Sequence, residues 1–119
     1  MYVKFLKSKL HRIKVTDSQI DYPGSVGIDE DMLKAADIQP YETVMIADID
    51  NGNRLETYAV PAPAGSGDCV ILGAAAHLVN KGDTIIIFSF EYLTKQEAAG
   101  HKPIVVTFNE GNKIKEIIR

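Results

Sequence analysis

Two strand-like runs joined by a tight turn limit the folds open to this chain more than any other feature. Residues 43–49 and 55–60 are rich in β-branched and apolar residues and flank Asn51-Gly52. This dipeptide tolerates the positive φ values of a type I′ turn, so the pattern predicts an antiparallel β-hairpin. Further strand-like runs occupy residues 2–6, 11–16, 69–72, 84–90 and 103–108. The chain is therefore expected to consist mainly of short strands.

One segment predicts a helix instead. Asp29 is a suitable N-cap, Glu30 and Asp31 complement the positive end of the helix dipole, and Pro40 sets a limit to the helix. The residues expected to face inward are Met32, Leu33, Ala35 and Ala36. Residues 74–79 suggest one or two more helical turns. Many short strands with one good helix favour a mainly β fold, a small β-barrel with minor helices.

Two more segments of the chain, residues 84–90 and 114–119, contain many apolar residues. The nearly continuous apolar run at 84–90 indicates a strand that is covered on both faces. The tail at 114–119 mixes apolar and charged residues and allows no assignment.

Composition narrows the classes of partner. A length of 119 residues fits a single domain, and the net charge of −3 argues against nucleic acid or an anionic membrane as a partner. No apolar run is long enough to span a bilayer, and the opening residues lack the apolar core of a signal peptide. The only cysteine, Cys69, is interpreted as a small core residue. These features favour a cytoplasmic domain.

Four segments carry candidate chemistry, and each also has an ordinary explanation. The segments are Ser8-Lys9-Leu10-His11-Arg12, Tyr22-Pro23-Gly24-Ser25, Arg54-Leu55-Glu56-Thr57-Tyr58 and Gly73-Ala74-Ala75-Ala76-His77. Gly-Ser is a common loop dipeptide, an arginine and a tyrosine suit a solvated strand face, and a run of alanines suits a turn into a helix. The three histidines lie in separate segments without metal-ligand spacing, so no metal site is expected.

Taken together, these segments resemble the bacterial aspartate 1-decarboxylase family, in order from Ser8 to about Phe90. The resemblance implies a double-psi β-barrel that assembles as a homotetramer with active sites shared between subunits. It also implies a precursor that cuts its own Gly24–Ser25 bond, giving a chain of residues 1–24 and a chain of residues 25–119. Ser25 would then become a covalent pyruvoyl cofactor. The implied activity is decarboxylation of L-aspartate to β-alanine for pantothenate biosynthesis.

The resemblance also implies roles for single residues. Ser25 would supply the pyruvoyl group that forms a Schiff base with the substrate, Gly24 would mark the cleavage site, and Tyr58 would donate a proton. The residues that would bind substrate or stabilise charge are Lys9, Arg54, Thr57, Gly73, Ala74 and Ala75, with His11 and Tyr22 in support. Strand alternation places Arg54 and Tyr58 on one face and Thr57 on the other, so an irregular backbone is expected there.

One departure keeps other functions open. The family usually has asparagine directly before Gly-Ala-Ala-Ala, whereas this chain has Leu72, which has no side-chain amide. Slower cleavage or an altered specificity would follow. The alternatives are an uncleaved, catalytically silent barrel that binds a small anion or a protein partner, and a pyruvoyl decarboxylase for a different acidic amino acid. Whether an accessory factor drives maturation is left open.

Overall fold

The computed structural model describes residues 1–119 and is dominated by strands. The strands are β1 (Val3–Lys14), β2 (Asp17–Gln19), β3 (Ser25–Asp29), β4 (Thr43–Asp48), β5 (Arg54–Ala62), β6 (Cys69–Leu72), β7 (Thr84–Leu93), β8 (Ile104–Asn109) and β9 (Lys113–Ile118). The helices are short: α1 (Glu30–Ala35), α2 (Lys95–Ala98) and the 3₁₀ helices η1 (Gly73–His77) and η2 (Glu110–Asn112). No helix is both long enough and apolar enough to cross a membrane.

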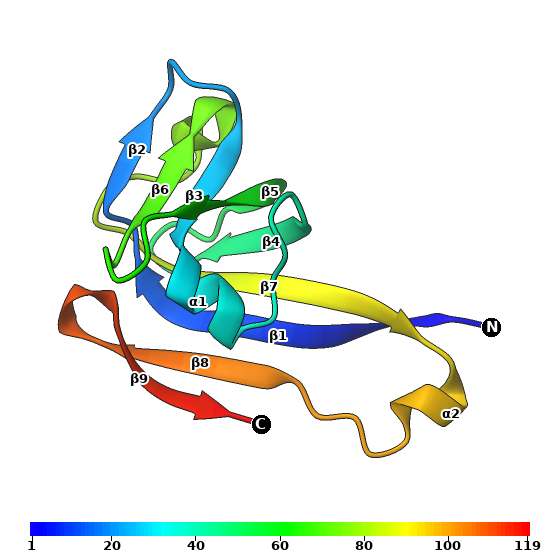
Figure 1. The fold of residues 1–119 in the computed structure, drawn as a ribbon. Coiled ribbons are helices and arrows are strands. Elements are labelled where there is room, and N and C mark those ends of the chain that lie inside the picture. The colour runs from blue at the N-terminus through cyan, green and yellow to red at the C-terminus, as the bar shows by residue number, and fades with distance from the viewer.

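The strands form a mixed sheet that curls back on itself. Their order is β2-β6-β3-β5-β4-β7-β1-β8-β9, so β1 and β2 lie far apart in the order although only Val15 and Thr16 separate them in sequence. These two residues connect both parts of the sheet, because Val15 N donates to Asp83 O (2.9 Å) and Thr16 N donates to Cys69 O (2.8 Å). The result is the expected small, mainly β barrel with minor helices (Figure 1).

A single apolar core fills the barrel. Its largest fully buried side chains include Leu10 of β1, Ile46 of β4, and Ile85 and Ile87 of β7. The helix α1 packs on this core through Met32, Leu33 and Ala35, and its C-cap Ala36 is buried as well. All four were expected to face inward. Burial of these side chains, rather than helix propensity, holds so short a helix in place.

Asp29 is the expected N-cap of α1. Its carboxylate is buried and accepts hydrogen bonds from the backbone N–H groups of Asp31 (2.8 Å), Gly65 (3.1 Å) and Gly67 (2.9 Å). One side chain therefore fixes both the start of α1 and the loop that leads to β6.

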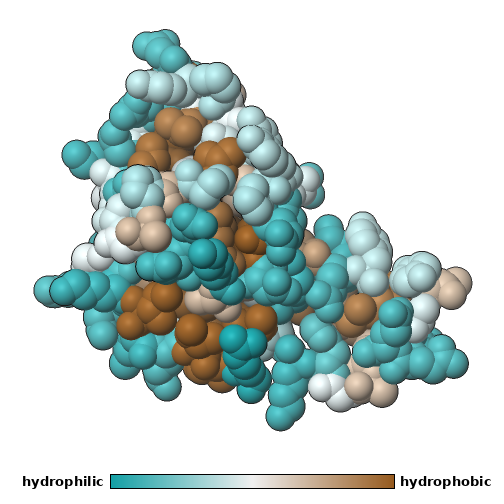
Figure 2. All heavy atoms as spheres, in the orientation of Figure 1, coloured by the Kyte–Doolittle hydropathy of each residue, from teal (hydrophilic) through white to brown (hydrophobic).

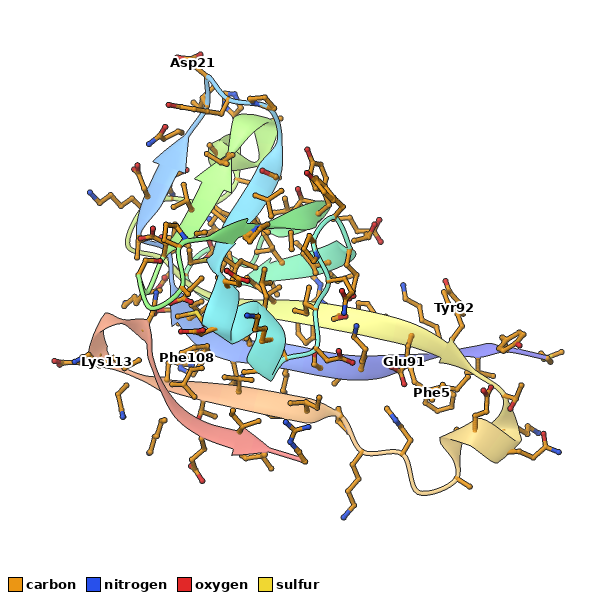
Figure 3. The ribbon with its side chains drawn as sticks, viewed as in Figure 1. Phe5, Asp21, Glu91, Tyr92, Phe108 and Lys113 are labelled. Carbon is orange, nitrogen blue, oxygen red and sulfur yellow. The ribbon has the colours of Figure 1, made fainter.

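A two-stranded arm projects from the barrel. Figure 1 shows the N-terminal end of β1 and the C-terminal end of β7 running together away from the barrel, with α2 beyond them. In Figure 3, Phe5 and Tyr92 lie on opposite faces of this arm. His101 attaches the chain after α2 to the arm: its Nε2 lies 2.8 Å from Leu6 O, and its ring centroid lies 5.8 Å from that of Phe5.

The C-terminal hairpin of β8 and β9 extends the sheet beyond β1. Strand β8 pairs with β1 in parallel and with β9 antiparallel. The tail that the sequence left unassigned is thus an edge strand. Figure 2 shows apolar side chains gathered over this hairpin, where Ile117 and Ile118 are exposed.

Strand β1 is one continuous strand, although the sequence suggested two separate runs. Two register shifts against β7, at Lys7 and at Arg12, interrupt the alternation of side chains, and Arg12 has a φ of 65°. A bulge adds a residue without ending the strand, so a break in the period of two was wrongly interpreted as a gap.

The β4–β5 hairpin is present, but its turn is not type I′. Gly52 has a φ of 79°, whereas Asn51 is not among the residues with positive φ, and residues 49–53 form a longer connection. The carboxylate of Asp48 accepts from Asp50 N (2.8 Å), and Asp48 O accepts from Gly52 N (2.9 Å). Side-chain capping by Asp48 replaces the local turn preference of Asn-Gly.

Strand β7 is fully buried on one face only. Ile85 and Ile87 are inaccessible to solvent, whereas Ile86 and Phe88 are half-buried within the single chain. The expectation of a strand covered on both faces is therefore wrong for the isolated chain.

Candidate active site

Ser25 lies at the first position of β3, a strand that the sequence did not predict. It is only 5% exposed and pairs directly with Leu72 of β6, while β3 also pairs in parallel with β5. Gly24, directly before it, is exposed and belongs to the loop between β2 and β3, whose tip is marked by Asp21 in Figure 3. The candidate bond therefore joins an exposed loop to a fixed, buried strand.

A cavity of about 310 Å³ lies beside this bond. Its wall is formed by Gly24, Leu55, Glu56, Thr57, Leu72, Ala74, Ala75 and Leu78. Four of these were expected from the sequence: Gly24, Thr57, Ala74 and Ala75. Of the other four, Leu55 and Glu56 fall inside a matched segment and Leu72 directly precedes one, whereas nothing in the sequence pointed to Leu78.

Small side chains shape one wall of this cavity. Gly73 is buried and begins η1, so that Ala74 and Ala75 of η1 border the space next to Gly24. Alanine leaves room close to the backbone, so a ligand of modest size can approach it. The sequence prediction of a turn into a short helix holds, although the helix is 3₁₀.

Strand alternation separates Thr57 from Arg54 and Tyr58. The register between β4 and β5 runs without a shift, from Thr43 opposite Tyr58 to Ala47 opposite Arg54. The irregular backbone expected here is therefore absent. Thr57 faces the cavity beside Gly24, whereas Arg54 and Tyr58 are exposed on the other face of β5.

Lys9 lies on that same outer face. It is paired with Phe88 of β7, which is in turn paired with Met45 of β4, and directly opposed residues of neighbouring strands share a face. The Arg54 guanidinium reaches this row: its carbon lies 5.7 Å from the centre of the Phe88 ring, and its Nη2 lies 3.4 Å from Met45 Sδ. The two cations expected to bind substrate thus extend over one surface.

His11 is two residues beyond Lys9 on this face. Burial, together with the positive charges of Lys9 and Arg12, lowers the pKa of His11 below its ordinary value. Its Nδ1 is buried without a hydrogen-bond partner. His11 is therefore neutral at pH 7 and can serve as a hydrogen-bonding group rather than as a third cation.

The predicted residues thus occupy two places in one chain. Gly24, Thr57, Ala74 and Ala75 border the cavity, with Ser25 buried next to it. The second place is the outer face of the sheet, which carries Lys9, His11, Arg54 and Tyr58. The Tyr58 ring lies 6.2 Å from the ring of Tyr41 there. Tyr22 is exposed on the loop before Gly24.

A thiol and a group of carboxylates, both of types that can take part in chemistry, lie outside the cavity and outside the outer face of the sheet. Cys69 is fully buried, and burial followed by the charge of Asp68 raises the pKa of its thiol to about 12, so it is a core residue, as expected. Asp48, Asp50 and Asp83 bring carboxylate oxygens within 4.8 Å of one another at the barrel end. No local pattern in the sequence predicted this trio, because Asp83 comes from a distant segment.

Comparison with known proteins adds independent evidence. A family model described as aspartate decarboxylase matches residues 1–115. The aspartate 1-decarboxylase of Legionella pneumophila strain Lens is 48% identical over 116 residues, which cover 98% of this chain and 87% of that protein. The one from Bacillus subtilis strain 168 is 45% identical over 118 residues, covering 99% and 93%. The one from Ralstonia pickettii strain 12J is 44% identical over 117 residues, covering 98% of both.

Proposed function

Because the chain belongs to the aspartate decarboxylase family, we propose that it converts L-aspartate to β-alanine and CO2 in pantothenate biosynthesis, with a pyruvoyl group made from its own Ser25. The observation that carries this proposal is the position of the Gly24–Ser25 bond. Ser25 is fixed in β3, and Gly24 borders a cavity that also contains Thr57.

The first proposed reaction is self-cleavage. Ser25 Oγ attacks the carbonyl carbon of Gly24, the C–N bond breaks, and an ester forms while the Ser25 amine is freed. Loss of the Ser25 α-proton then breaks the Cβ–O bond and releases residues 1–24 with a new carboxylate. Water replaces the remaining nitrogen as ammonia and leaves a ketone at position 25. A serine hydroxyl is a weak nucleophile, so the reaction depends on a held geometry.

Thr57 is suited to assist this attack. Its side chain faces the same cavity as Gly24, and a hydroxyl there donates a hydrogen bond to the oxyanion that forms on the Gly24 carbonyl. Pro23 restricts the loop that precedes the bond. The residues present therefore fit a pyruvoyl group at position 25, with space for a small substrate beside Ala74 and Ala75.

In the mature enzyme, a pyruvoyl group at position 25 would supply an electron-withdrawing carbonyl for the substrate amine and for the charge left when CO2 departs. Arg54 and Lys9 bind the carboxylates of aspartate, the first through its planar fork. Tyr58 provides the proton for the α-carbon. This division of roles favours a dicarboxylic amino acid over a neutral one.

Since the cavity and the cationic face are separate in one chain, the active enzyme is a homotetramer in which one subunit supplies Lys9 and Arg54 to the cavity of another. Exposed apolar side chains around the cavity support a contact between subunits there. Leu78 lines the cavity, and Tyr22 and Tyr58 belong to segments that border it, yet all three are exposed in the isolated chain. Their burial in an assembly would stabilise it.

Denaturing intact-mass spectrometry of the purified protein tests the function. Two species, residues 1–24 and residues 25–119 lacking one ammonia relative to a chain that starts with serine, are expected to accompany release of CO2 from L-aspartate. The Ser25→Ala variant should stay uncut and inactive. Light scattering on the same sample should give the mass of four copies of the 119-residue protein.

Other outcomes favour the alternatives. A single uncut chain with no carbonyl, even after incubation with an extract from its source, would indicate a silent barrel. Turnover of another acidic amino acid in preference to aspartate would change the substrate but keep the cofactor. A cleaved and active Ser25→Ala protein would contradict the mechanism altogether.

A further inference from the structure

The start of η1 lies against the peptide that the proposed function cleaves. Strands β3 and β6 are antiparallel with Ser25 opposite Leu72, so Gly24 and Gly73 occupy the same end of this ladder. Gly73 is buried and has a φ of 77°, a conformation that strongly favours glycine. The two glycines are therefore direct neighbours through their backbones.

The contact leaves no space for a side chain on Gly73. A Cβ added there would lie 2.6 Å from Gly24 Cα, 2.8 Å from Gly24 N and 2.8 Å from Tyr22 O. Real Cβ atoms essentially never come within 3.0 Å of heavy atoms outside their own residue and its chain neighbours. All three neighbours are backbone atoms, so none can rotate away. A Cβ on Gly24 would meet only Leu72 O, at 4.0 Å. The steric constraint on the bond therefore comes from Gly73.

We propose that Gly73 is a positioning residue for self-cleavage: its bare backbone holds the Gly24–Ser25 peptide against the wall that contains Thr57. This inference rests on the proposed function and deepens it. A methyl group on Gly73 would push Gly24 away from that wall. Because a displacement of about 1 Å can cost about a hundredfold in rate, the Ser25 hydroxyl would lose its attack geometry.

The test compares two glycines with similar backbones and different surroundings. Gly82 has a φ of 90° and nothing within 4 Å of an added Cβ, so Gly82→Ala carries the backbone strain without the contact. Cleavage is followed by intact mass from the first purified sample onward. We expect Gly73→Ala to cleave about tenfold more slowly than wild type, or slower still, and Gly82→Ala to cleave within about twofold of wild type.

A second measurement separates positioning from folding. Both glycine variants are made in the Ser25→Ala background, which the proposed mechanism does not cleave, and their thermal unfolding is compared. We expect similar midpoints for the two double variants. Equal cleavage rates for Gly73→Ala and Gly82→Ala would overturn the inference, and so would a Gly73→Ala, Ser25→Ala protein that does not fold. A wild-type chain that stays uncut even after incubation with an extract from its source would instead refute the proposed function, on which this inference depends.

Discussion

Ser25 and Leu72 are direct partners in the antiparallel ladder between β3 and β6, so their side chains lie on the same face of the sheet. Leu72 also lines the cavity that contains Gly24 and Thr57. A branched apolar side chain thus occupies a place from which an amide could donate a hydrogen bond to the reacting carbonyl.

Replacing Leu72 by asparagine should accelerate self-cleavage several-fold, on the order of 1 kcal/mol for one added hydrogen bond in the transition state. The rate is measured by intact mass on freshly purified protein. Leu55→Asn places the same amide on another part of the cavity wall and is the matched control. An unchanged or slower rate for Leu72→Asn would show that leucine is no handicap here.

Thr57→Val should slow self-cleavage by roughly 10²-fold to 10³-fold, because valine keeps the shape of threonine but cannot donate to an oxyanion. The fold should be retained, since the change removes only one hydroxyl from a half-buried position. Thr43→Val, on the neighbouring strand, is the control and should cleave at the normal rate. Normal cleavage by Thr57→Val would exclude Thr57 from the maturation step.

Arg54→Ala should leave cleavage intact and impair turnover. Arg54 lies on the outer face of β5, away from the cavity that Gly24 borders in its own chain. The group that Arg54 is proposed to bind in a neighbouring subunit is a substrate carboxylate, which is absent during cleavage. Without this contact, KM for aspartate should rise about tenfold or more. Steady-state kinetics on fully cleaved protein measure this KM. Lys34→Ala is the control for the loss of one positive charge elsewhere on the protein. Impaired cleavage together with an unchanged KM would contradict this separation.

The pair of Asp48 and Asp83 should make stability depend on pH. Burial, followed by the hydrogen bond to Asp83, raises the pKa of Asp48 to about 6, and the same hydrogen bond lowers the pKa of Asp83. A raised folded-state pKa means that the stabilising contribution of protonated Asp48 is complete below about 4 and is lost as the pH rises through 6. Above pH 6 two adjacent charges repel each other.

Asp48→Asn should therefore gain stability relative to wild type as the pH rises from 5 to 8, since an amide can donate to Asp83 at any pH. Thermal unfolding midpoints of both proteins at several pH values measure this difference. Asp37→Asn is the control variant, because it removes an exposed carboxylate and keeps a residue that tolerates the positive φ of 56°. A constant difference between Asp48→Asn and wild type across this range would show that the pair does not titrate there.

Asp29→Ala should destabilise the fold by about 3 kcal/mol, more than the loss of an ordinary N-cap, which costs ~1 kcal/mol. The reason is that three backbone N–H groups, on Asp31, Gly65 and Gly67, would lose a buried charged acceptor. Urea unfolding measures the difference. Thr94→Ala removes the exposed capping box of α2 and serves for comparison. Equal losses for the two variants would mean that the loop contacts add nothing.

Local signals in the sequence correctly determined several elements. The carboxylate of Asp29 caps α1, the strand-like runs around Asn51-Gly52 form a hairpin, and the short apolar run at residues 69–72 is a strand. Each depends on interactions between residues close in sequence or on a regular alternation. The segments that resemble the aspartate decarboxylase family could also be found without coordinates, because residue identity and order carry that information.

Pairing between strands far apart in sequence determined the remaining elements and the arrangement of the site. Strand β3 has the weakly strand-like sequence Ser25-Val26-Gly27-Ile28-Asp29, and it is a strand because it lies fully buried between β5 and β6. The alternation of β5 could be predicted, but not that Thr57 would border the same cavity as Gly24 while Arg54 would reach the row of Lys9. Which distant strands become neighbours depends on how the whole chain buries its apolar surface, and no local pattern records that choice.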